Sequence, residues 1–296
     1  MKVIVAGGTG FIGGYLCWLL ERQGHGVVVL SRSAAASQGA RKDVLWDGAT
    51  PGPWETEVDG AGAVINLCGA SIAKGRWTKD RKKELRSSRL DSTRALVAAI
   101  SAAKRKPGVF INGSAIGWYG DRGEETLDEG SLAGKGFLAE LCQDWEKEAQ
   151  KAQEVRVNCL RIGLVLGKGG GALSKMQLPF KLGLGGRLGS GRQWMSWISR
   201  DDLCSLILHI LTTDSPGPYN GTAPAPVTNQ EFTRALGAAV GRPALLPAPG
   251  FALKLALGEM SELLLTGQKV LPAKARASGY VFQHPDLASA LKASLR

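Results

Sequence analysis

The sequence predicts an α/β protein with a doubly wound, mostly parallel sheet and a smaller C-terminal substrate-binding region. Through the first 168 residues, short apolar runs alternate with amphipathic segments, as the strands and helices of a covered parallel sheet do. After about residue 168 the pattern changes to glycine-rich and proline-rich stretches. We therefore expect a main domain over residues 1–168, with a contribution from about 196–222, and a smaller region over 169–296.

The individual elements follow from hydrophobic periodicity. The run KVIVA at residues 2–6 is short, continuous and apolar, as a buried parallel strand is. From Phe11 to Leu20, apolar residues recur in adjacent pairs every four residues, which forms one face of a helix. The same reasoning predicts further strands at 27–30, 44–46, 63–67, 109–111 and 155–160, and helices at 89–103, 138–151, 201–211 and 229–240, with one short helix within 169–191.

Composition narrows the class of protein. With 44% hydrophobic and 21% charged residues, the 296-residue chain can bury a sizeable core. It has no uninterrupted apolar stretch of about 18 residues, so we expect no membrane span. The five cysteines never form a CxxC pair and the three histidines are far apart, which argues against a disulfide framework and a metal site. The opening MKVIVA is too short for a signal peptide, so we expect a cytoplasmic location.

The net charge of +11 suggests an anionic partner. From Lys74 to Arg94 there are nine Lys or Arg residues against three Asp or Glu, so this segment holds six of the eleven excess charges. Either it is a solvated helix face, or it is a rim that attracts a phosphorylated ligand. Nucleic acid is not expected as a partner, because no nucleic-acid motif is present and aromatic residues make up only 6% of the chain.

A glycine motif with the spacing GxxGxxG follows the first predicted strand and opens the first predicted helix. Glycines there allow a tight turn, a close approach of backbone N–H groups to a diphosphate, and close helix–strand packing. The N-terminus of the helix then faces the anion with its unpaired N–H groups. The alternative is a glycine turn that only packs. The motif predicts a dinucleotide site formed by Gly7, Thr9, Gly10, Phe11, Ile12 and Gly13.

The end of the second predicted strand favours NADP over NAD. An acid there would bind the ribose 2′-hydroxyl of NAD, but after Arg32 no acid appears for ten residues. Arg32 can pair with a 2′-phosphate, and Ser31 can donate a hydrogen bond to it. The alternative is that Arg32 is an ordinary exposed arginine. Asp47, after the third predicted strand, is a weaker candidate for accepting a hydrogen bond from the adenine amino group.

Three segments together resemble the extended short-chain dehydrogenase/reductase superfamily, which includes nucleotide-sugar epimerases and dehydratases. They are GGTGFIG at 7–13, NLCG at 66–69 and SAIGWYG at 114–120. Two later segments, LPFKLGLGG at 178–186 and GQKVLP at 267–272, are similar to an atypical subgroup of epimerase family proteins described as NADP-dependent oxidoreductases. The resemblance implies a Rossmann fold, bound NADP, a small-molecule substrate that is sugar-like or anionic, and a homodimer.

The resemblance also assigns further residues to the cofactor. Leu67 and Cys68 would contact it through their backbones, and Leu164 would lie beside it after a later strand. Arg89 stands at the expected start of a helix, where epimerases carry an asparagine; its alternative is a charge on the helix surface. Glu84 precedes Arg89 by five residues and would orient it.

The superfamily's catalytic residues are a Ser or Thr and a tyrosine–lysine pair spaced YxxxK, in which lysine lowers the tyrosine pKa so that the phenolate moves a proton. Ser114 matches the serine. Where YxxxK is expected the sequence reads GFLAELC, from Gly136 to Cys142, so both members of the pair are missing. Tyr119, close to Ser114, is the remaining tyrosine candidate. The alternatives are that Tyr119 only packs its loop and that Ser114 only hydrogen-bonds it.

Two functions remain open at this level. The first is an NADP-dependent oxidoreductase or epimerase-like enzyme, which the retained Ser114 favours. The second is an NADP(H)-binding sensor or scaffold without catalysis, which the missing YxxxK pair favours. In the enzyme, an anionic group of the substrate would meet basic residues of the C-terminal region: Lys175, Lys181, Arg187 and Arg192.

Overall fold

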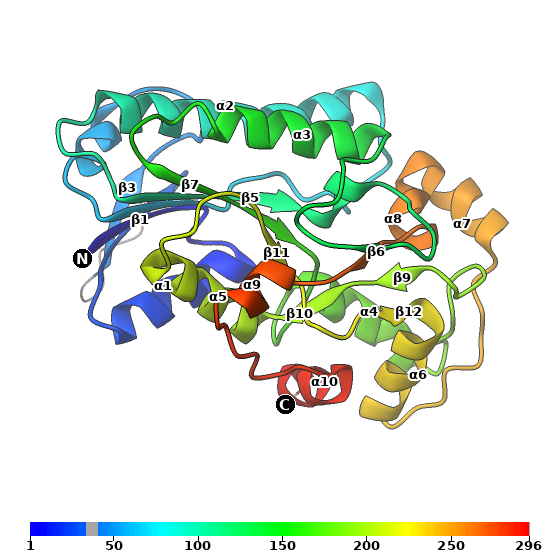
Figure 1. Cartoon of the computed structure of the whole chain (residues 1–296). Helices are drawn as coiled ribbons and strands as arrows, with labels where there is room; N and C mark the ends of the chain where they lie inside the picture. The colour runs from blue at the N-terminus through cyan, green and yellow to red at the C-terminus, as the bar shows by residue number, and fades with distance from the viewer. Residues whose placement is uncertain (34–40, 296) are drawn as a thin grey trace.

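The computed structural model of the chain describes residues 1–33 and 41–295. Among these residues, seven strands form one sheet in the order β11-β7-β5-β4-β1-β2-β3 (Figure 1). Every neighbouring pair in it is parallel, which confirms the predicted doubly wound sheet. The strands are β1 (Lys2–Ala6), β2 (Gly26–Ser31), β3 (Arg41–Leu45), β4 (Ala63–Asn66), β5 (Val109–Ala115), β7 (Arg156–Ile162) and β11 (Tyr219–Gly221).

Helices cover both faces of this sheet (Figure 1). On one face, Leu16 of the first helix and Ile207 of a later one join a core with Val3 of β1. On the other face, Leu96 and its neighbours join a second core with Ile4 of β1. The alternation of Val3 and Ile4 between two cores explains why all four residues from Val3 to Ala6 are apolar. The four covering helices are α1 (Phe11–Arg22) with α5 (Arg200–Thr212), and α2 (Lys79–Ala102) with α3 (Phe137–Ala149).

The C-terminal part builds a third core. Leu173, Trp197, Phe232 and Leu291 are buried together in it. Its segments also pair with the rest of the chain, because β13 adds in parallel to β6. The boundary near residue 168 stays a prediction. The remaining elements are β6 (Thr126–Leu127), β8 (Leu164–Leu166), α4 (Gly171–Lys181), β9 (Trp194–Met195), β10 (Trp197–Ser199), β12 (Val227–Thr228), α6 (Asn229–Ala239), α7 (Gly250–Leu257), α8 (Glu262–Leu265), β13 (Lys269–Val270), α9 (Ala273–Ala277) and α10 (Leu287–Leu295), with short 3-10 turns at Pro53–Glu57, Ile116–Tyr119 and Gly258–Ser261.

The main difference from the predicted elements lies at the start of α2. The helix begins at Lys79, ten residues before the expected Arg89, and the Thr78 side chain caps it by accepting a hydrogen bond from the Arg81 N–H. The first two turns are basic and bury only Leu85, so they carry little of the apolar periodicity that predicts a helix. Arg89 therefore lies inside α2 and not at its start.

Among the residues that the structure describes, no helix has the length and apolar character that a membrane crossing requires. Over the same ranges, no group of three His, Cys, Asp or Glu side chains is placed to hold a metal ion.

The carboxylate of Asp202 on α5 joins the main sheet to the C-terminal segment. It is fully buried and accepts hydrogen bonds from the backbone N–H groups of Gln283 at 2.7 Å and His284 at 2.9 Å, and from the Ser199 hydroxyl at 2.8 Å. In Asp202→Asn, the side-chain NH₂ group replaces one acceptor oxygen, so it faces one of these donors and the hydrogen bond to that donor is lost. We expect a loss of about 2–3 kcal/mol in the free energy of unfolding, measured by urea denaturation.

Asp214→Asn is the matched control, because the Asp214 side chain is fully exposed. We expect the control to stay within about 0.5 kcal/mol of the original chain. Equal stability of both variants would show that the Asp202 carboxylate does not hold the C-terminal segment.

Candidate functional site

A pocket of about 480 Å³ opens where β1, β2 and β4 end. In an open parallel sheet, ligands bind at this edge, where the strand order reverses. Eight of the predicted cofactor residues line it. They are Gly7, Thr9, Gly10, Ser31, Arg32, Leu67, Cys68 and Glu84, joined by Leu30, Trp46–Ala49, Gly69, Ala70, Ser87, Ser88, Asp91 and Ser92.

The glycine loop forms the floor of this pocket. Gly7 has φ +79°, and a Cβ at Gly13 would lie 2.2 Å from the carbonyl oxygen of Gly7. Both positions therefore require glycine. No side chain caps α1, and the first bond of the helix runs from the Gly14 N–H to the Gly10 oxygen at 2.8 Å. The N–H groups of residues 11–13 precede this first bond, as at any helix N-terminus, where they can bind an anion. Phe11, Ile12 and Gly13 are not part of the lining of the 480 Å³ pocket, so their contact with a cofactor stays a prediction.

Arg32 is exposed on the pocket wall and makes no hydrogen bond or ion pair with any residue of 1–33 or 41–295. Ser31 is buried, and its hydroxyl donates to the Ser33 carbonyl at 2.5 Å, so it must rotate before it can donate to a phosphate. The Asp47 carboxylate accepts from the backbone N–H and the hydroxyl of Thr50 at 2.8 and 2.7 Å, and these bonds lower the Asp47 pKa.

Leu67 and Cys68 continue from β4 along the pocket. The Cys68 N–H donates to the Asn66 side chain at 3.1 Å, which fixes the turn after the strand. Burial raises the pKa of the Cys68 thiol to about 12, so it is a neutral thiol at physiological pH. Cys68 therefore lines the pocket without offering a thiolate, and its backbone contact with a cofactor stays a prediction.

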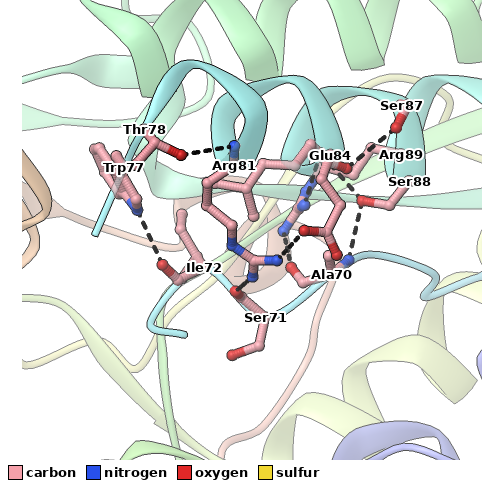
Figure 2. Close-up of polar contacts among 11 residues, drawn as sticks. Ala70, Ser71, Ile72, Trp77, Thr78, Arg81, Glu84, Ser87, Ser88 and Arg89 are labelled. Carbon is pink, nitrogen blue, oxygen red and sulfur yellow. Dashed lines mark hydrogen bonds and ion pairs between the residues drawn. The ribbon is translucent and has the colours of Figure 1, made fainter. Parts of the chain in front are cut away.

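The expectation that Glu84 orients Arg89 is wrong (Figure 2). Glu84 pairs with Arg81 at 2.5 Å. Arg89 instead donates to the backbone carbonyls of Leu85 at 3.0 Å and Ala70 at 3.2 Å. The guanidinium thereby fastens the 69–70 turn to α2, and burial lowers the pKa of Arg89. Arg89 does not line the 480 Å³ pocket, so its contact with a cofactor stays a prediction.

The basic run from Lys74 to Arg94 is largely paired within the chain. Arg76 donates to backbone carbonyls at the end of α7. Four others form ion pairs with carboxylates, which favours the helix-face interpretation over a rim that attracts phosphate. The pairs are Arg81–Glu84, Lys82–Glu259, Arg86–Asp144 and Arg94–Asp91.

A buried polar network surrounds Ser114 at the end of β5. The Ser114 hydroxyl donates to Glu146 on α3 at 2.7 Å. Arg161 on β7 binds both oxygens of Glu146, each at 2.9 Å, in a bidentate ion pair. Glu146 is 7% exposed and Arg161 3% exposed, so water screens this pair weakly. The network fixes the orientation of the Ser114 hydroxyl.

The structure contradicts the catalytic assignment of Tyr119. This side chain is fully buried; its hydroxyl donates to Asn220 at 2.8 Å and accepts from Arg161 at 3.0 Å. Burial raises the pKa of Tyr119, the opposite of what a phenolate catalyst requires. Sequence reasoning missed Glu146 and Arg161. The available signal was a charged residue, Arg161, directly after the apolar pair Cys159 and Leu160 that ends a predicted buried strand, and before Ile162.

Apolar packing occupies the positions where YxxxK is expected. Leu141 is buried with Trp77 and Met260, and Phe137 packs against the same cluster. The Phe137 and Trp77 rings meet edge to face at 5.4 Å. This cluster joins the starts of α2 and α3 to the 3-10 turn after α7, so these positions stabilise the contact with the C-terminal region.

Two further groups lie away from the pocket. The Leu164 N–H donates to the Ser196 carbonyl at 2.9 Å and its side chain packs on the third core, so the structure does not bring Leu164 to the 480 Å³ pocket. The predicted basic residues of the C-terminal region are all exposed: Lys175, Lys181, Arg187 and Arg192.

Removing one member of the Glu146–Arg161 ion pair should destabilise the fold strongly. Glu146→Ala leaves the Arg161 guanidinium buried without its carboxylate, so we expect a loss of about 3–5 kcal/mol in urea denaturation. The double variant Glu146→Leu with Arg161→Met removes both charges and should lose less than the single variant. A double variant less stable than Glu146→Ala would contradict this account of the pair.

Comparison with known proteins agrees with this fold. The model of the NAD dependent epimerase/dehydratase family matches residues 3–221, and that of a domain of unknown function matches 248–294. The epimerase family protein SDR39U1 homolog, chloroplastic, of Arabidopsis thaliana is 43% identical over 100% of this chain and 87% of its own length. The epimerase family protein YfhF of Bacillus subtilis is 41% identical over 98% of this chain and 97% of its own length.

Solved structures give the same result. The crystal structure of human epimerase family protein SDR39U1, determined with NADPH, superposes with a TM-score of 0.91 and 37% identity over 99% of each chain. The chain therefore belongs to the NAD dependent epimerase/dehydratase family, in the extended short-chain dehydrogenase/reductase superfamily, as an SDR39U1-like protein.

Proposed function

We propose that this protein is an NADP-dependent oxidoreductase or epimerase-like enzyme that acts on a small molecule at the strand ends, beneath the C-terminal region. One observation carries the proposal: Gly10, at the uncapped N-terminus of α1, and Arg32, which has no ion pair among residues 1–33 and 41–295, line a single pocket. A helix N-terminus and a free guanidinium are both anion-binding groups. NADP carries its diphosphate and its 2′-phosphate on the same adenosine half.

The pocket residues fit this cofactor. The absence of a Cβ at Gly7 and Gly13 brings the loop backbone close enough for a diphosphate to reach the N–H groups of residues 11–13. Arg32 would hold the 2′-phosphate, with the backbone of Leu67 and Cys68 along the opposite side. When bound, the cofactor supplies or accepts a hydride. The human relative solved with NADPH supports the choice of NADP.

A sensor without catalysis is the second candidate. Phe137 and Leu141 pack in an apolar cluster, and the Tyr119 hydroxyl donates to Asn220 within the buried network. Neither the expected YxxxK positions nor Tyr119 therefore supplies the tyrosine that moves a proton in the superfamily. Ser114 is the remaining catalytic candidate, as a hydrogen-bonding partner for the substrate. It is 3% exposed and donates to Glu146, so a substrate would have to replace Glu146 as its acceptor. A cytoplasmic location and a homodimer stay predictions; the Arabidopsis relative is named chloroplastic.

The cofactor preference is testable by isothermal titration calorimetry with NADPH and NADH. We expect the original chain to bind NADPH at least about tenfold more tightly, because the second-strand guanidinium meets a doubly charged phosphate. Arg32→Ala should remove most of that preference. Arg105→Ala is the control, because the Arg105 side chain is 80% exposed. It precedes the amino end of β5, whereas the pocket lies at the carboxyl ends of the strands. Equal affinity for the two cofactors in the original chain would contradict the proposal.

Turnover separates the enzyme from the sensor. A panel of carbonyl compounds and nucleotide sugars is incubated with the protein and NADPH, and NADPH consumption is followed by absorbance. We expect consumption with at least one compound, a loss of about 10²-fold or more in Ser114→Ala, and no change in Arg105→Ala. Binding of NADPH without consumption across the panel would favour the sensor.

A further inference from the structure

Two segments of the C-terminal region carry positive charge and no negative charge. Residues 171–192 and 232–258 contain seven Lys or Arg residues and no Asp or Glu. The two acids that adjoin the second segment are engaged, because Glu231 caps the start of α6 and Glu259 pairs with Lys82. All seven cationic side chains are exposed: Lys175, Lys181, Arg187, Arg192, Arg234, Arg242 and Lys254.

The same two segments expose large apolar side chains. Among the residues that the structure describes, twelve large apolar side chains are exposed, and seven of them lie in these segments. They are Leu178, Leu182, Leu184, Leu245, Leu246, Phe251 and Leu255. Single exposed apolar residues are ordinary on a protein surface, but a group of them marks a binding surface.

Backbone hydrogen bonds hold the two segments side by side. The Leu246 N–H donates to the Gly185 carbonyl at 3.0 Å, and the Gly189 N–H donates to the Ala248 carbonyl at 2.9 Å. A Cβ at Gly189 would lie 3.9 Å from the Cα of Gly250, the first residue of α7. The connection from α6 to α7 follows the right-hand edge of the molecule in Figure 1. We call the surface formed by residues 171–192 and 232–258 the basic apolar edge.

The helix α7 presents an apolar face of this edge. Its eight residues read GFALKLAL, and none of them is buried. Phe251 and Leu255 are four residues apart and therefore lie on the same face, where they are 77% and 79% exposed. Lys254 carries the single charge of the helix. Such a helix is suited to lie at the boundary between lipid headgroups and acyl chains, with its apolar side chains inserted.

A pocket of about 510 Å³ lies at the end of α6, within the same edge. Arg234, Arg242 and Leu245 line it, and its other lining residues carry no charge. Neither guanidinium forms a hydrogen bond or an ion pair with any residue of 1–33 or 41–295. Guanidinium groups bind phosphate through paired N–H donors. The pocket therefore fits a phosphate that is attached to an apolar group, as in a phospholipid.

A second copy of this chain is a poor occupant of the edge. In a symmetric dimer the same surface meets itself, so the seven cations would face one another with no acid from either segment to pair with them. The surface of an anionic bilayer supplies both the negative charge and an apolar interior. Docking on that surface requires no helix that crosses the membrane.

We propose that the basic apolar edge docks this protein on an anionic lipid bilayer. Phe251 and Leu255 enter the acyl boundary, and Arg234 and Arg242 bind lipid phosphate in the 510 Å³ pocket. The other cations of the edge face the charged headgroups. This role goes beyond the proposed cofactor chemistry and does not depend on it.

Vesicle flotation with the full chain tests the docking. The vesicles consist of phosphatidylcholine alone, or of phosphatidylcholine with about 30% phosphatidylglycerol, which makes their surface negative. We expect binding to the anionic vesicles to be at least about tenfold tighter. Raising the salt from about 0.1 M to about 0.5 M should weaken it, because salt screens the charges.

Two pairs of variants separate the apolar contribution from that of charge. Phe251→Glu should weaken binding to the anionic vesicles about tenfold or more, because an acid replaces the inserted ring. Val281→Glu is its control, since Val281 is 82% exposed and lies outside the edge. Arg242→Ala should weaken binding about fivefold. Arg105→Ala removes an exposed arginine outside the edge and should leave binding within about twofold of the original chain.

Unchanged midpoints of urea denaturation would show that these losses come from the surface and not from unfolding. Three results would overturn the proposal: no binding to either kind of vesicle, equal binding to both, or an equal loss in Val281→Glu and Phe251→Glu. A dimer seen by size-exclusion chromatography that Phe251→Glu abolishes, without vesicle binding, would also overturn it and would assign the edge to a second copy.

Discussion

The structure depends on one close approach of backbone to backbone. A Cβ atom at Gly13 would lie only 2.2 Å from the carbonyl oxygen of Gly7. The loop after β1 and the first turn of α1 therefore pack at a distance that only glycine allows. This contact aims the uncapped N-terminus of α1 at the strand ends, where a second glycine, Gly10, lines the pocket. Arg32, which follows the last residue of β2, lines the same pocket.

A second constraint is the buried ion pair of Glu146 and Arg161. It joins α3 to β7 and binds Ser114 and Tyr119 into one network. A typical member of the superfamily uses a tyrosine with a lowered pKa. Here the nearby Tyr119 has a raised one, because it is buried. Phe137 and Leu141, at the positions where the superfamily has its tyrosine and lysine, pack in an apolar cluster and cannot transfer a proton.

Sequence patterns predicted the parts of the fold that depend on short-range periodicity. The β1 strand, the glycine loop and α1 follow from adjacent residues, so their positions agree closely. The first turns of α2 were missed because Lys79 to Arg86 are mostly solvated and show no apolar stripe. The Glu84–Arg81 pair could not be distinguished from a Glu84–Arg89 pair, since both spacings are short and only side-chain geometry decides between them. Contacts between distant segments, such as that of Glu146 with Arg161, leave no local pattern.

A crystal structure of this chain with NADPH tests the central claim most directly. The account predicts diphosphate oxygens at about 3 Å from the N–H groups of Phe11 and Ile12, with the 2′-phosphate on the Arg32 guanidinium. Electron density that places the dinucleotide outside the pocket, or the 2′-phosphate away from Arg32, would contradict it.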